Sequence, residues 1–144
     1  MESLDSVKLL KECDAGAKMA VSSFEDVLDF VTDPEMEKLL KDSKKEHEHL
    51  GNEIHALLKA AGSGDKDPHP VAKGMSWIKT NMKLAIDNSD ATVADLIIDG
   101  CNMGVKSLYK YMNQYQQADL DAKRLCEKLI YIEEKLCGEL KEYL

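Results

Sequence analysis

Apolar residues recur at alternating spacings of three and four positions through most of the chain, with polar residues between them. In the first such stretch, Val7, Leu10, Ala17 and Phe24 fall on one face of a helix. This period is typical of an amphipathic α-helix that buries one side. It predicts four long helices over residues 4–31, 34–61, 91–115 and 120–144, and a shorter helix over 71–86.

Two short polar segments interrupt this pattern and predict tight turns. Asp33 can cap a helix that starts at Pro34, and Asp119 occupies the corresponding place before the last helix. An Asp at this place accepts a hydrogen bond from the first helical turn, and Pro suits the first helical position. Such short links force the flanking helices into antiparallel hairpins. The Gly- and Pro-rich residues 61–70 instead predict a loop.

The two hairpins resemble each other in sequence. Segment 16–24 recurs 84 positions later as 100–108, with Gly, Met, Val and Ser in common. The second helices match at a shift of 86, the separation of Asp33 and Asp119. We therefore predict a duplicated helical hairpin.

This organisation predicts one domain over residues 1–144. Its parts are a hairpin over 4–61, a crossover over 62–89 and a hairpin over 90–144. A crossover of this length can travel along a whole helix, which gives an up-down-down-up order.

A duplicated hairpin with a long crossover between the second and third bundle helices resembles the ferritin-like superfamily. Within it, the chain is similar to an uncharacterised bacterial branch, in the Asp33-Pro34-Glu35 turn and in the short helix with Trp77 in the crossover. The resemblance implies an all-α, ferritin-like four-helix bundle with a short extra helix in its crossover.

The same resemblance raises the question of a metal site, because catalytic members hold two irons with inward Glu residues and two Glu-x-x-His pairs. One such pair, Glu46 and His49, is present, but the matching segment of the last helix has no His and ends in Lys135. We expect no catalytic residue, no metal and no cofactor. If a metal is bound, the candidate ligands are Asp14, Glu46, His49, Asp99 and Glu133.

Small residues lie in the middle of the first and third bundle helices, where they let backbones approach closely. We expect these residues at a helix crossing: Gly16, Ala17, Ala20, Gly100, Cys101 and Gly104. Two polar residues, Asp14 and His47, also fall on inward faces. A buried carboxylate must pair, protonate or face a polar cavity, so Asp14 needs a Tyr hydroxyl, a Lys or a metal. We expect His47 to bond to Ser43 or a backbone carbonyl.

Composition narrows the partners. The chain of 144 residues has a net charge of −8, which opposes binding to nucleic acid and anionic membranes. No apolar run approaches the roughly 18 residues that span a bilayer. The first residues lack the layout of a signal peptide. The four Cys residues are widely spaced on apolar faces, so we expect free thiols, no disulfides and a cytoplasmic protein.

Three functions remain open from the sequence. The preferred one is a non-enzymatic bundle that acts as a homo-oligomer or with a protein partner, through exposed aromatic candidates at Trp77, Tyr109 and Tyr131. The second is a carboxylate metal protein of the iron type. The third is a small-molecule binder, with a cavity where the Gly and Ala residues of the helix crossing leave space.

Overall fold

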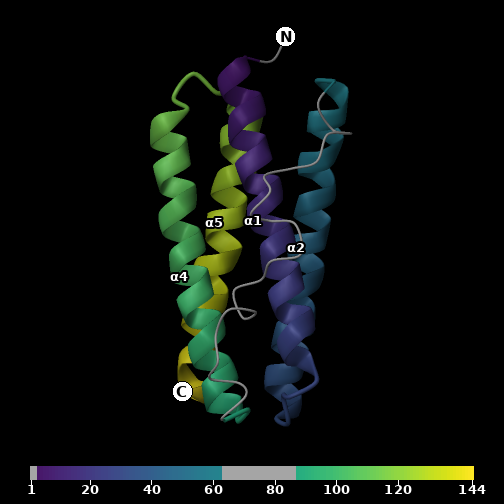
Figure 1. The fold of residues 1–144 in the computed structure, drawn as a ribbon, viewed down its shortest axis with the longest axis vertical. Coiled ribbons are helices and arrows are strands. Elements are labelled where there is room, and N and C mark those ends of the chain that lie inside the picture. Colours follow the sequence, from purple (N-terminus) through teal and green to yellow (C-terminus); the bar gives the residue numbers. More distant parts are fainter. Residues whose placement is uncertain (1–2, 63–86) are drawn as a thin grey trace.

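The computed structural model describes residues 3–62 and 87–144, and these form a four-helix bundle (Figure 1). The helices are α1 (Leu4–Leu28), α2 (Pro34–Ala60), α4 (Asp90–Gln114) and α5 (Leu120–Leu140), followed by a 3₁₀ turn, η2 (Lys141–Tyr143). The described residues contain no strand, and the predicted all-α bundle is confirmed. The predicted short helix over 71–86, with Trp77, lies outside the described residues.

The two hairpins lie side by side with α2 and α4 running in the same direction. In Figure 1, α1 and α2 form one side of the bundle, and α4 and α5 form the other. The start of α1 contacts the α4–α5 turn, whereas the α1–α2 turn contacts the start of α4. Therefore α2 ends and α4 begins at opposite ends of the bundle. α1 and α5 pack across the diagonal.

All four helices begin with the same kind of cap, in which a side-chain oxygen accepts a hydrogen bond from a backbone N–H three residues on. The capping residues are Ser3, Asp33, Ser89 and Asp119. From Ser3 to Ser89, as from Asp33 to Asp119, is 86 residues, and α1 and α4 are both 25 residues long. The hairpins are therefore equivalent at a shift of 86 in both helices. The 84-residue match of the small segments lies two residues out of this register.

Asp90 ties the two hairpins together at one end of the bundle. Its Oδ1 accepts a hydrogen bond from Thr32 N at 2.8 Å, and its Oδ2 accepts from Thr32 Oγ1 at 2.9 Å and Asp33 N at 3.0 Å. The backbone N–H of Thr32 is the main cause that lowers the pKa of Asp90, so the carboxylate form is favoured.

A matching set of contacts lies at the other end. Asp5 Oδ2 accepts from Gln117 N at 2.9 Å, and Ser6 Oγ accepts from Asp119 N at 2.7 Å. Each turn is thus held by the first residues of the other hairpin. These contacts fix the position of one hairpin relative to the other along the bundle axis.

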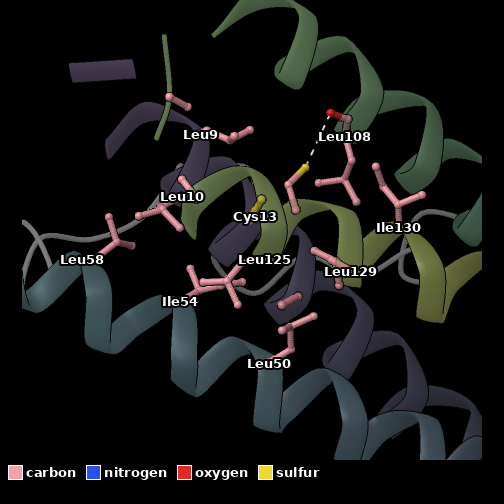
Figure 2. Packing of buried hydrophobic residues seen from close by; sticks show 14 residues of the cluster. Leu9, Leu10, Cys13, Leu50, Ile54, Leu58, Leu108, Leu125, Leu129 and Ile130 are labelled. Carbon is pink, nitrogen blue, oxygen red and sulfur yellow. Dashed lines mark hydrogen bonds between the residues drawn. The ribbon is translucent and has the colours of Figure 1, made fainter. Parts of the chain in front are cut away.

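Two apolar clusters fill the bundle, one toward each end. Figure 2 shows the cluster near the α4–α5 turn, where Leu50 and Ile54 of α2 lie close to Leu125 and Leu129 of α5. The second cluster, around Phe24, lies near the α1–α2 turn. On α2 and α5, the residues between the two clusters include buried polar side chains. The apolar core is therefore interrupted by polar groups in mid-bundle.

Candidate functional site

His47 is the buried polar residue of α2 in mid-bundle, and its side chain is 0% exposed. Its Nδ1 lies 2.8 Å from the carbonyl oxygen of Ser43. Because a carbonyl oxygen only accepts, Nδ1 must carry the proton and Nε2 must be the bare acceptor of the neutral ring. Nε2 is buried and has no hydrogen-bond partner within the described part of the chain.

The surroundings of His47 keep it uncharged. Burial lowers the pKa of His47 from 6.5 to about 4, and the Ser43 carbonyl opposes only part of this change. Phe24 lies edge-on to the ring, with 5.2 Å between the ring centroids. At neutral pH, His47 therefore offers a single unpaired lone pair on Nε2.

A pocket of about 480 Å³ between α1 and α2 includes His47 in its lining. Ala17 and Gly51 also line it, and a Cβ atom added to Gly51 would lie 3.6 Å from the Cβ of Ala17. Small residues on both helices keep side chains from filling this groove. Besides His47, the charged, amide and imidazole groups of the lining are Asp14, Lys18, Glu25, Glu48, Asn52 and His55.

Asp14 is 4% exposed, and its partner is a lysine one turn along the same helix. The Nζ of the half-exposed Lys18 lies 2.9 Å from Asp14 Oδ2. Of the alternatives that the sequence left open, the structure shows the Lys pair. Both residues line the pocket, so an ion pair lies in the same lining as the His47 ring.

Glu133 is the counterpart of His47 in the second hairpin, 86 residues later, and it is 2% exposed. Its carboxyl group occupies the space where a side chain at Gly104 would begin. Burial raises the pKa of Glu133 well above its ordinary value, and the nearby Cys126 thiol adds to the shift. The uncharged carboxylic acid is therefore favoured.

The burial of Glu133 is hard to predict because the apolar period of α5 can also be drawn through its neighbour Ile132, which is only half-buried. The available signal was the shift of 86 residues, which pairs Glu133 with the inward-facing His47.

The six small residues do not form one crossing between α1 and α4, and this expectation needs correction. Gly104 faces Glu133 of α5, and a Cβ added to Gly16 would meet Leu129 of α5. Ala17 faces Gly51 of α2. Of the other three, Ala20 and Cys101 share an apolar cluster, and Gly100 is buried. The expected cavity at Gly104 is filled by the Glu133 carboxyl.

The conditional metal ligands are not brought together either. Asp14 and Glu133 are buried, whereas Glu46, His49 and Asp99 are exposed. The Glu46/His49 pair points outward because the inward positions of α2 are Ser43, His47 and Leu50, and His49 instead lies 3.2 Å from Glu53. Among residues 3–62 and 87–144, no three His, Cys, Asp or Glu side chains are placed to share a metal ion.

The four cysteines are free, as the spacing predicted. Cys13, Cys101 and Cys126 are buried, and Cys137 is partly buried. The Cys126 thiol donates to the Leu108 carbonyl, drawn as a dashed line in Figure 2. A hydrogen bond with Cys126, together with burial, raises the pKa of Cys13 well above its usual value, which disfavours a reactive thiolate.

These features define an all-α four-helix bundle with a polar pocket between the helices of its first hairpin. No family model matches the chain, and no curated protein matches it in sequence. In structure it is similar to a conserved hypothetical protein, Rv2844, from Mycobacterium tuberculosis, with a TM-score of 0.75. The match covers 100% of both chains at 14% sequence identity, and therefore concerns the fold alone. Among the described residues, no helix is long and apolar enough to cross a membrane.

Proposed function

We propose that the protein is a non-enzymatic binding protein that takes a small ligand in the pocket between α1 and α2. The observation that carries this proposal is the buried Nε2 of His47, an acceptor with no donor within the described residues. An unsatisfied buried acceptor costs about 1–3 kcal/mol of stability. Because His47 is 0% exposed, a ligand must displace the side chains that cover Nε2, and the hydrogen bond that it donates would then offset this cost.

The pocket has further properties of a ligand site. It is concave, combines apolar and polar lining groups, and has a rigid imidazole held by α2 on one ring nitrogen. Fixing Nδ1 with Ser43 orients Nε2 before the ligand arrives. Such preorganisation lowers the entropic cost of binding.

For its class, we propose a ferritin-like bundle that has lost the di-iron ligands. Two features support this class. α2 and α4 run in the same direction, and the end of α2 and the start of α4 lie at opposite ends of the bundle. The inward polar residue of α2 in mid-bundle is His47. On α4, Gly104 has no side chain, and the Glu133 side chain of α5 fills the space next to it.

The test is a fragment screen by NMR on the full chain, using matched pairs of fragments that differ only in one hydrogen-bond donor. Donor-bearing fragments should shift the backbone amides of Ala17 and Gly51 and the Nε2 resonance of His47. His47→Phe should abolish these shifts, whereas His49→Phe, an exposed residue of the same helix, should preserve them.

Two results would contradict the proposal. One is the absence of any fragment that shifts the pocket amides of the wild-type protein. The other is binding at those amides that leaves the His47 Nε2 resonance unchanged, a readout that does not depend on whether a variant folds.

A further inference from the structure

The charge of the pocket indicates which class of ligand it takes. Its lining carries three carboxylates, Asp14, Glu25 and Glu48, against one ammonium group, Lys18, and it also includes the imidazole of the exposed His55. Lys18 bonds Asp14 through Oδ2 only. Glu25 has Lys44 at 4.0 Å, at the limit of an ion pair, and Lys44 is not part of the lining. The pocket therefore has an excess of negative charge.

We infer that the ligand is a small organic cation whose ammonium group donates to His47 Nε2 and is attracted by the pocket carboxylates. This inference rests on the proposed function and specifies its ligand. An ammonium has three N–H donors and no acceptor, so it suits a site that offers the bare Nε2 of His47 and carboxylate oxygens.

Other ligand classes fit the same groups less well. An anion would be repelled by the excess of carboxylates in the lining. A neutral alcohol could donate to Nε2 or to a carboxylate oxygen, but it carries no charge and gains no ion-pair attraction from Asp14, Glu25 and Glu48. A metal ion needs several converging ligands, and the described residues place no three His, Cys, Asp or Glu side chains together for one.

The test is a calorimetric titration of the full chain at pH 7 with ligands of similar length and different charge. The probes are n-butylamine, 1,4-diaminobutane, butane-1,4-diol and succinate. The amines should bind, and succinate should not. The diol should bind at least about tenfold more weakly than the diamine, because it has no positive charge to pair with the carboxylates. Raising the salt concentration should weaken the binding of the amines and leave the affinity for the diol unchanged.

Two exposed glutamates of α2 provide a matched pair of variants. Glu48 lines the pocket, whereas Glu46 is exposed on the same helix and is not part of the lining. Glu48→Gln should weaken the binding of 1,4-diaminobutane about two- to fivefold, which is the effect expected from removing one solvent-exposed charge. Glu46→Gln should leave the affinity unchanged. Neither position is buried, so both variants should fold.

The outcomes separate this inference from the proposed function. If the diol or succinate bound at the pocket amides as tightly as the amines, the inference of a cationic ligand would be wrong, but the proposed binding function would stand. Tighter binding of zinc alone than of any amine would also overturn the inference of an organic cation. A blocked lysine, Nα-acetyl-lysine methylamide, that bound more tightly than n-butylamine would place the ammonium on a protein partner and overturn a free small ligand. No binding by any probe or fragment would remove both proposals.

Discussion

At the scale of single residues, His47 and Glu133 occupy equivalent positions in the two hairpins, and their pKa values are shifted in opposite directions. Burial favours the uncharged form of each, which lowers the pKa of the imidazole and raises the pKa of the carboxyl group. His47 resists gaining a proton, and Glu133 resists losing one. Mid-bundle polarity is therefore maintained without a buried charge at either position.

His47→Phe should reduce the loss of stability in acid. The pKa of His47 falls from 6.5 in the unfolded chain to about 4 in the fold, so its contribution is present above pH 6.5 and is lost as pH falls toward 4. The shift corresponds to about 3 kcal/mol at most. Urea unfolding from pH 7 to 4 measures the slope, and the exposed His49→Phe serves as control. Equal slopes for His47→Phe and the parent would show that the ring titrates normally.

Glu133→Gln should stabilise the protein at neutral and alkaline pH. A raised pKa means that the fold favours the protonated acid, so stability falls as pH rises from the ordinary value through the raised value. Gln has nearly the same shape and cannot ionise. Chemical denaturation across pH 5–9 checks this, with the exposed Glu134→Gln as the control. A parent whose stability does not fall more steeply than that of Glu133→Gln would contradict the burial of an acid here.

Gly104 and Gly138 form a natural pair for substitution by Ala. Both lie inside helices, where Ala is favoured over Gly by about 1 kcal/mol. A Cβ at Gly104 would collide with the Glu133 carboxyl, whereas a Cβ at Gly138 meets no atom of the described residues within 4 Å. Gly138→Ala should therefore stabilise, and Gly104→Ala should stabilise less or destabilise. Thermal unfolding measures both.

The double variant isolates the cause. In a Glu133→Ala background, Gly104→Ala should recover the full helix-propensity gain, because the obstructing carboxyl is absent. The same cost for Gly104→Ala with and without Glu133 would show that the contact is not responsible. Gly104→Leu in the parent should cost about 1–3 kcal/mol through overpacking.

The sequence identified some of these residues and missed others for a physical reason. Asp14 and His47 interrupt regular apolar patterns, so their inward position could be read from spacing alone. Glu133 lies next to the apolar Ile132, and the periodic pattern can be drawn through either residue. Only the packing of α5 on Gly104 decides between them.

At the scale of elements, the helices and caps were predictable because their signals are local. The Ser and Asp caps and Pro34 fix the helix starts to within one residue. The end of α1 was predicted at Val31 but lies at Leu28. The prediction was too long because Val31, which is buried in the turn, continues the apolar period of the helix. Apolar spacing therefore reports burial even where the backbone has left the helix.

The contacts of Asp90 were not predictable, since they join residues far apart in the chain. Asp90→Ala removes three hydrogen bonds to the α1–α2 turn and should cost about 1–2 kcal/mol in a largely solvated setting. Asp121→Ala is the control, because the exposed Asp121 contacts Arg124 of its own helix at 3.9 Å and makes no hydrogen bond or ion pair to the other hairpin within residues 3–62 and 87–144. Urea titrations at pH 7 compare the two. An Asp90→Ala variant as stable as Asp121→Ala would show that the tie between hairpins carries no stability.

At the scale of the whole molecule, duplication made the bundle predictable but not its pocket. Two similar hairpins and a long connection restrict the topology to few arrangements. The pocket instead depends on how closely α1 approaches α2 at Ala17 and Gly51, which is a property of three-dimensional packing. At the α1–α4 crossing, where a cavity was expected, the Glu133 carboxyl fills the space at Gly104.

Association of the bundle with itself or with a partner protein stays a prediction. Leu120 and Tyr131 are both exposed on α5, and their separation of eleven residues places them on one face about three turns apart. If this face mediates self-association, light scattering should give a mass above that of one chain, and Tyr131→Glu should lower it. A parent protein with the mass of one chain at all concentrations would exclude a homo-oligomer.

The central claim is that His47 is held neutral, with Nδ1 protonated and Nε2 bare, in mid-bundle. A long-range ¹H–¹⁵N NMR spectrum of the full chain at pH 7 tests it most directly, because protonated and bare ring nitrogens resonate in well-separated regions. We predict a protonated Nδ1 and a bare Nε2 for His47, unchanged down to about pH 4. A proton on Nε2, or a doubly protonated ring at pH 6, would contradict the account.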